Sequence, residues 1–296
     1  MMHVYDLNSA LPGRTRIAFG SFDGMHIGHQ AVIGRLLGWE GQTPAVVSFS
    51  EAAAPVIYSE AEKAYLLKNR QVSLMVSLPR EEMEAMTGEA FVREILVGRL
   101  QMASAVVGEN VCFGADRAGV EQLRKLGAEL GFDVDVVPAV CWDGKPVSAE
   151  EIRQAIAEGN FGKMTVLLGH TYIMQGTVVH GKAAGRRHGM PTANLGVAAN
   201  KLFPPHGVYA TLCHMDGAVY RGATNIGLRP SDDEIPIPTV ETLLMDFSRD
   251  IYGRQITLEV CRYIRGVMKF ANLDEVRRQI DKDMLQIAGF LDESSE

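Results

Sequence analysis

The chain has 296 residues, of which 47% are apolar and 22% are charged, and its formal net charge is -7. This length exceeds the size at which one hydrophobic core usually stops growing, so two domains are expected. The apolar stretches are too short to cross a bilayer, and an acidic balance without long charged runs offers no general attraction for nucleic acid or anionic lipid. We therefore expect neither a nucleic-acid partner nor a membrane partner.

Residues 1–10 contain Asp6 and lack a basic start followed by an apolar stretch, which argues against a secretory signal and favours a cytoplasmic location. The four cysteines lie far apart without the paired spacing of a structural zinc site. We expect all four thiols to be reduced and most of them to be buried. They are Cys112, Cys141, Cys213 and Cys261.

Short apolar runs alternate with helical patterns in the first half of the chain. They occupy residues 16–19, 31–37, 45–49, 89–100 and 105–108. This β-α-β order predicts a Rossmann-like parallel sheet covered by helices, with ligands beyond the carboxyl ends of the strands. Two glycine-rich loops, 20–28 and 113–119, follow predicted strands and precede the helical stretches 30–37 and 120–130. We expect both loops to face one cleft.

The pattern changes near residues 159–170, where short β-rich runs separated by Gly, Pro and Asp clusters begin. These runs cover residues 176–179, 207–212, 239–245 and 255–265. They predict a β-barrel, closed by a helix over 272–290 that Asn272 caps. The expected division is an α/β domain at 1–168 and a barrel domain at 169–296.

Residues 176–194 combine four glycines, several cations and the tetrad Pro191-Thr192-Ala193-Asn194. Glycines let backbone N–H groups approach phosphate oxygens, and cations neutralise the charge, although a hairpin with a basic face would also use them. In an extended stretch, Thr192 and Asn194 point to one face, where their oxygens can serve Mg²⁺.

From about Gly169 to about Ile287 the sequence resembles the riboflavin kinase family. The matching pieces after the tetrad are Gly207-Val208-Tyr209-Ala210, Thr224-Asn225-Ile226-Gly227, Thr239-Val240-Glu241-Thr242, Asp246-Phe247, Tyr252-Gly253, Arg265 and Lys269-Phe270. The resemblance implies a riboflavin kinase barrel that phosphorylates riboflavin to FMN with ATP and Mg²⁺.

The same resemblance assigns roles to individual residues. A lone Glu in an alternating strand is usually an outward-facing carboxylate, but the family has its catalytic base at the position of Glu241. The remaining implied roles are Mg²⁺ binding by Thr192 and Asn194, contact with ATP phosphates by Gly181 and Arg186, a nucleotide contact by Tyr252, and flavin contacts by Arg265 and Phe270. For Tyr252 and Phe270, core packing remains an equal alternative.

The loop Gly20-Ser21-Phe22-Asp23-Gly24-Met25-His26-Ile27-Gly28-His29 carries two imidazoles at i and i+3, on one side of a first helical turn. Such a pair can donate to phosphate oxygens without a metal. Binding of zinc by the two histidines is less favoured than binding of phosphate, because no nearby Cys, His or paired acid supplies the remaining ligands of a tetrahedral zinc site. A bare His-x-x-His pair, without its surrounding loop, is usually a surface feature of no consequence.

The whole loop resembles the His-x-Gly-His signature of nucleotidyltransferases, as found in the N-terminal module of bifunctional FAD synthetases. The resemblance implies that His26 and His29 stabilise the charge that develops when FMN phosphate attacks the ATP α-phosphate. The residues that it implies for nucleotide binding are Gly20, Phe22, Asp23, Gly28 and Arg153.

The chain departs from this family where a helix N-terminus normally carries Ser-Ser-Thr before an Ile-Arg pair. Here the sequence is Ser148-Ala149-Glu150-Glu151-Ile152-Arg153. Ser148 and Glu151 form a capping-box pattern, so the helix should form. Carboxylates in the turn where phosphate would bind should repel it, however. We therefore expect FMN adenylyltransferase activity to be low or altered.

Three alternatives remain beside a bifunctional enzyme that makes FMN and then FAD. One is a riboflavin kinase with a non-catalytic N-terminal module, and another is a flavin-sensing or nucleotide-sensing regulator. The retention of Thr192, Asn194 and Glu241 argues against the regulator. An aminoacyl-tRNA synthetase also uses a His-x-Gly-His motif, but the short chain, the barrel half and the acidic balance argue against that class.

Overall fold

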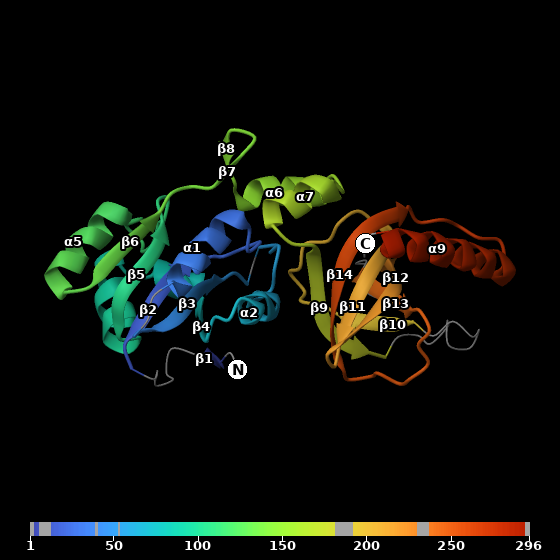
Figure 1. Cartoon of the computed structure of the whole chain (residues 1–296), viewed down its shortest axis with the longest axis horizontal. Helices are drawn as coiled ribbons and strands as arrows, with labels where there is room; N and C mark the ends of the chain where they lie inside the picture. Colours follow the sequence, from blue (N-terminus) through green and yellow to red (C-terminus); the bar gives the residue numbers. More distant parts are fainter. Residues whose placement is uncertain are drawn as a thin grey trace. The chain divides into compact units, whose positions relative to one another are not determined.

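The computed structural model describes residues 3–5, 13–38, 41–52, 54–180, 192–229 and 237–293. The chain divides into two compact units, which Figure 1 shows in the colours of the sequence. The first unit comprises Met1–Ile152 with Leu167–Gly169, and the second comprises Arg153–Val166 with His170–Glu296. No helix among the described residues is both long enough and apolar enough to cross a membrane.

The first unit is built on a six-stranded sheet in the order β1-β4-β3-β2-β5-β6, and every neighbouring pair is parallel. Its strands are β1 (His3–Tyr5), β2 (Thr15–Gly20), β3 (Thr43–Ser50), β4 (Leu74–Pro79), β5 (Met102–Gly108) and β6 (Asp133–Val137). The predicted strands at 16–19, 45–49 and 105–108 are confirmed as β2, β3 and β5. The Rossmann-like character is thereby confirmed as well.

Helices cover this sheet, as the cartoon in Figure 1 shows. They are α1 (Ile27–Leu37), α2 (Glu60–Asn69), α3 (Arg80–Glu84), α4 (Gly88–Ala90), the π-helix η1 (Phe91–Arg99) and α5 (Val120–Leu130). One face packs an aromatic cluster in which the ring of Phe19 lies 5.7 Å from Phe91 and 5.3 Å from Phe113, between centroids. Edge contacts of this kind stabilise a core beyond simple burial.

A hairpin of β7 (Cys141–Trp142) and β8 (Lys145–Pro146) leads to α6 (Ala149–Ala157) and α7 (Phe161–Leu168). Helix α1 begins at Ile27, three residues earlier than the pattern predicted. The earlier start follows from His26, whose ring nitrogen accepts a hydrogen bond from the backbone N–H of His29 and so caps the helix.

The second unit is a closed antiparallel barrel in the order β10-β13-β12-β11-β14-β9. Its strands are β9 (Tyr172–Val179), β10 (Ala193–Gly196), β11 (Gly207–Met215), β12 (Ala218–Arg229), β13 (Ile237–Leu244) and β14 (Gln255–Arg265). The predicted barrel is therefore confirmed. A chain of buried hydroxyls crosses three strands, from Thr211 to Thr224 over 2.8 Å and from Thr224 to Thr242 over 2.9 Å.

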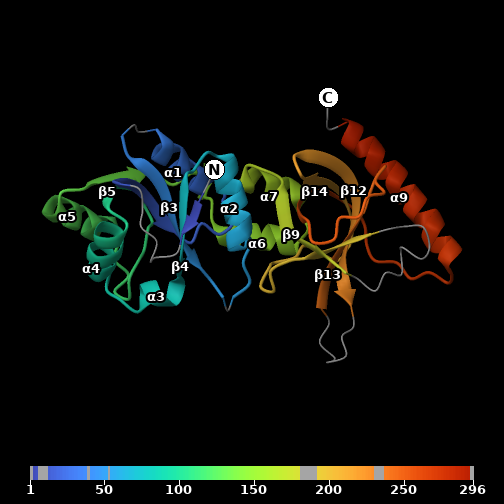
Figure 2. The same cartoon turned by 90° about the horizontal axis from the view of Figure 1, so that it is seen from below.

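Helix α9 (Leu273–Glu293) runs along the outside of this barrel beside β12 (Figure 2), and it also contacts β11. Ile287 and Leu291 of the helix pack with Ala210 in a buried apolar cluster. Asn272 accepts a hydrogen bond from the backbone N–H of Glu275 over 3.0 Å, so the predicted N-cap is confirmed.

The cysteines are free, as expected, but the prediction that most of them are buried is wrong. Cys112 and Cys141 are exposed because they lie in a loop and a short hairpin rather than in packed strands. Cys213 is buried in β11 and Cys261 is partly buried in β14, and burial raises the pKa of each thiol to about 11.

Candidate functional site

A cavity of about 830 Å³ opens in the first unit, beyond the carboxyl ends of β2 and β5. Both predicted glycine-rich loops line it, which confirms that they face one cleft. The predicted site residues in its wall are Gly20, Phe22, His26, Gly28 and His29. This chain therefore has a cavity at the edge of the parallel sheet where nucleotides usually bind.

The two predicted catalytic histidines form a stacked pair in the cavity wall. Their ring centroids lie 3.6 Å apart, and Nδ1 of His26 accepts from the backbone N–H of His29 over 3.3 Å. Gly28 makes this packing possible, since a Cβ at that position would lie 3.1 Å from two ring atoms of His26. The accepting Nδ1 leaves the proton of a neutral His26 ring on Nε2, which can donate to a ligand.

Burial determines the charge of this pair. Burial lowers the pKa of His26 to about 4. The pKa of His29 lies well below its ordinary value because of burial and, to a lesser degree, the charges of His26 and Lys63. Both rings are therefore neutral near pH 7 and can act as hydrogen-bond donors rather than as cations. Nδ1 of His29 is buried and has no hydrogen-bond partner among the described residues.

The other predicted residues of the first loop hold its shape. The carboxylate of Asp23 is buried and accepts backbone N–H groups of Ile57 over 2.9 Å and of Tyr58 over 3.1 Å. Phe22 is also buried, and its ring centroid lies 5.2 Å from that of His29. Asp23 therefore ties the loop to its neighbouring segment, and Phe22 supports the His29 ring.

The second loop contributes a cation for which no site role was predicted. Arg117 lines the cavity, and its backbone has a φ of 53° within the turn that the Phe113–Ala118 bridge closes. Asp116, beside it, accepts from the backbone N–H of Gly88 over 2.7 Å and anchors the loop. The sequence signal for Arg117 was its place in a glycine-rich turn, which does not by itself distinguish a ligand contact from a solvated charge.

The beginning of α6 also reaches the cavity, through Ser148 and Ala149. The hydroxyl of Ser148 accepts from the backbone N–H of Glu151 over 3.3 Å, which is one of the two bonds of the predicted capping box. This bond uses one lone pair of the Ser148 oxygen and leaves its O–H group able to donate, while two carboxylates follow in the first turn. Arg153 is partly buried further along α6 and is not among the residues that line the cavity.

In the second unit, the barrel brings the predicted base and a predicted metal ligand together. Asn194 on β10 is the register partner of Glu241 on β13, and Glu241 is in turn the partner of Asn225 on β12. Register partners share a face of the sheet. Because Val240 and Thr242 point into the barrel, these three side chains lie on its outer face. Thr192 is partly buried and directly precedes β10.

Two further predicted kinase residues, Tyr252 and Phe270, lie in different segments of the second unit. The ring of Tyr252 stacks on that of His180 with centroids 3.8 Å apart. Phe270 is partly buried in the segment that leads to α9. Gly181 and Arg186 lie outside the described residues.

Arg265 has a partner that sequence reasoning missed. Its Nε lies 3.0 Å from both carboxylate oxygens of Asp283 on α9, and its Nη2 lies 2.7 Å from one of them. Asp283 is buried. This geometry makes Arg265 an anchor for α9, and the predicted flavin contact remains a prediction.

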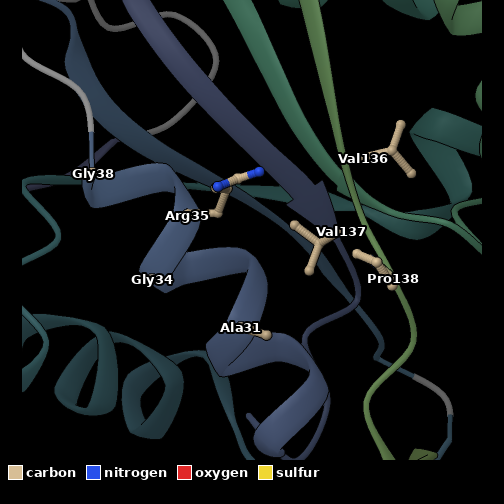
Figure 3. Close-up of a pocket in the computed structure, with 7 residues that line it drawn as sticks. All are labelled: Ala31, Gly34, Arg35, Gly38, Val136, Val137 and Pro138. Atoms are coloured by element: carbon tan, nitrogen blue, oxygen red, sulfur yellow. The ribbon is translucent and has the colours of Figure 1, made fainter.

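A second hollow lies between α1 and β6 and contains none of the predicted site residues (Figure 3). Gly34 and Gly38 leave space along the helix, and Val136 and Val137 form the opposite wall. Arg35, the one charged side chain among the described residues of its wall, pairs with Asp135 over 3.0 Å. We assign no chemistry to this hollow.

Two family models match the chain, one for each unit. The riboflavin kinase model covers residues 168–291, and the FAD synthetase model covers residues 9–151. The bifunctional riboflavin kinase/FMN adenylyltransferase of Bacillus subtilis is 31% identical over 95% of this chain and 94% of its own length. The bifunctional riboflavin kinase/FMN adenylyltransferase of Escherichia coli K12 is 32% identical over 97% of this chain and 96% of its own length. The chain therefore belongs to the family of bifunctional riboflavin kinase/FMN adenylyltransferases.

A solved structure described as a macrolide-efflux protein from Streptococcus pneumoniae has the same fold along nearly the whole chain. The TM-score is 0.77 at 26% identity, and the match covers 95% of this chain and 97% of that one. Efflux is the description of that protein, and what the two chains share is their architecture.

Proposed function

We propose that the second unit phosphorylates riboflavin to FMN and that the first unit adenylylates FMN to FAD, with ATP as the co-substrate of both reactions. The observation that carries the kinase is the juxtaposition of Asn194 and Glu241 on one outer face of the barrel. The observation that supports the adenylyltransferase is the neutral histidine pair in the wall of the cavity.

In the kinase reaction, Glu241 accepts the proton of the riboflavin 5′-hydroxyl. The freed oxygen bonds to the γ-phosphorus of ATP, and the bond from that phosphorus to the bridging oxygen breaks and releases ADP. Gly181 and Arg186 are the proposed contacts for the ATP phosphates, Tyr252 for the nucleotide, and Phe270 for the flavin.

The residues of the barrel fit a bound Mg²⁺, because Asn194 offers a neutral oxygen beside the Glu241 carboxylate and Thr192 directly precedes β10. Thr192 and Asn194 would hold the ion. When bound, Mg²⁺ neutralises part of the charge on the ATP phosphates. Glu241 is the proposed base for the hydroxyl proton.

In the adenylyl transfer, a phosphate oxygen of FMN bonds to the α-phosphorus of ATP, and the bond to the leaving pyrophosphate breaks. The Nε2–H group of His26 donates a hydrogen bond to the negative charge that develops. Gly20 and Gly28 leave room for the phosphates, and Phe22 and Asp23 hold the loop that carries the histidines. The nucleotide contact predicted for Arg153 of α6 remains a prediction.

We infer that the adenylyl transfer is slower than the kinase reaction. Glu150 and Glu151 place negative charge at the α6 N-terminus, where the triphosphate of ATP would approach. The test supplies FMN and ATP directly and measures pyrophosphate and FAD, next to FMN formation from riboflavin in the same preparation. FAD formation as fast as FMN formation would contradict the inference. The absence of FAD would favour a riboflavin kinase with a non-catalytic first unit.

A further inference from the structure

A buried lysine lies beneath the loop that carries the histidine pair. Lys63 of α2 is only 2% exposed, although its neighbour on the same helix, Lys68, is exposed. Taking an ammonium group out of water costs free energy unless partners surround it. A lysine this deeply buried therefore indicates a local structure built to hold its charge.

Three oxygens surround the ammonium group. Nζ of Lys63 donates to the backbone carbonyl of Ser21 over 2.7 Å, to the hydroxyl of Ser48 over 3.2 Å and to Oε1 of Glu60 over 2.8 Å. An ammonium group has three donors, so all of them are used. The bond to Ser21 is the one that joins Lys63 to the histidine loop.

The pair of Lys63 and Glu60 also connects three neighbouring strands near their carboxyl ends. Ser48 of β3 is the register partner of Gly20 on β2 and of Ser77 on β4. The second carboxylate oxygen of Glu60 accepts from the hydroxyl of Ser77 over 3.1 Å. The network therefore fixes the histidine loop relative to the edge of the sheet that bounds the cavity.

We propose that Lys63 is a positioning residue for adenylyl transfer, which holds the Ser21 carbonyl and thereby keeps the histidine loop in its ligand-binding conformation. The proposal rests on the proposed adenylyltransferase function of the first unit. The positive charge of Lys63 also lies close enough to His29 to disfavour protonation of that ring. Lys63 is not among the residues that line the cavity, so its effect on the reaction passes through the loop.

The test compares Lys63→Met with Lys68→Met in the full-length protein. Both variants lose one lysine from α2, but only the first loses the contact with Ser21. We expect kcat for FAD formation from supplied FMN to fall about 10- to 100-fold in Lys63→Met. The KM for FMN should change far less, the kinase rate should be unchanged, and Lys63→Arg should recover part of the loss. Equal kcat values for FAD formation in the two Met variants would overturn the proposal, and so would an equal loss of both activities.

A second measurement does not depend on activity. Hydrogen–deuterium exchange of residues 20–29 should accelerate in Lys63→Met relative to Lys68→Met, while β5 in the same unit exchanges unchanged. If wild-type protein makes no FAD, the proposed adenylyl transfer fails, and this exchange still tests whether Lys63 holds the loop. Equal exchange in the two variants, or faster exchange throughout the first unit, would contradict a positioning role. If Lys63→Met does not fold, Lys63→Gln, which keeps a polar group at this position but shortens the side chain and removes the ammonium group, replaces it in both measurements.

Discussion

Asn194 on β10 and Glu241 on β13 are register partners on the outer face of the barrel. Inside the barrel, buried threonine hydroxyls form a hydrogen-bonded chain. Asn194 and Glu241 are 47 positions apart in the sequence, and antiparallel pairing of the strands brings them together. An amide oxygen that can serve a metal and a carboxylate that can accept a proton thus lie side by side, as phosphoryl transfer to a hydroxyl requires.

Replacing Glu241 with Gln should remove the proposed base while keeping the size of the side chain. We expect FMN formation from riboflavin to fall by about 10²- to 10⁴-fold. Conversion of supplied FMN to FAD should remain at the wild-type rate because the other unit performs it. The control is Glu259→Gln, a partly exposed carboxylate on β14 that pairs with His214. Similar kinase rates in the two variants would show that Glu241 is not the base.

Replacing His26 and His29 together with Ala should remove the proposed donors of the cavity. FAD formation should fall by about 10²-fold or more, as for the loss of an oxyanion donor, and FMN formation should persist in the same sample. Chromatographic separation of the flavins measures both rates at once. The exposed His206 of the second unit provides the matched substitution to Ala. FAD formation that survives the double replacement would exclude the pair from the reaction.

The buried imidazoles should make the stability of the first unit depend on pH. Because the pKa of His26 is about 4 in the folded state against 6.5 ordinarily, the unfolded chain binds the proton first as pH falls. Stability should therefore decrease between about pH 6.5 and pH 4, by about 3 kcal/mol for this residue. Denaturant unfolding followed at several pH values measures the change. A double His26→Ala, His29→Ala variant should lose most of this pH dependence. If its free energy of unfolding changes with pH as steeply as that of the wild type, the rings are not buried in the neutral form.

Restoring hydroxyls at the α6 N-terminus should accelerate FAD formation. In the variant Ala149→Ser, Glu150→Thr, one carboxylate is removed and two donors are added beside the cavity. We expect about a 10-fold higher rate from FMN and ATP, which corresponds to ~1.4 kcal/mol of stabilisation. The kinase rate serves as the reference. A variant no faster than wild type would mean that this helix end does not limit the reaction.

Local patterns predicted most of the architecture, because alternating strands, helical spacing and turn residues are short-range signals. The strand at 105–108, the helix at 120–130 and the capped final helix were all visible in this way. The contacts of Lys63 and Arg265 were not, since each is made across the fold. Lys63 lies within the helix α2, and only the packed sheet brings Ser21 and Ser48 to its ammonium group.

The same reasoning explains the incorrect expectation for the cysteines. Small apolar side chains are usually buried, but the loop at Cys112 borders the cavity and leaves its thiol exposed. The shared cleft was predicted because both loops follow parallel strands, whose carboxyl ends meet at one edge. The protonation state of the histidine pair depends on burial, which no local pattern reports.

The most direct test of the two-unit account is a time course of the purified protein with riboflavin, ATP and Mg²⁺, in which riboflavin, FMN and FAD are separated by chromatography. The account predicts that FMN appears first and accumulates, and that FAD follows at a lower rate. A mixture in which riboflavin remains unchanged would contradict it.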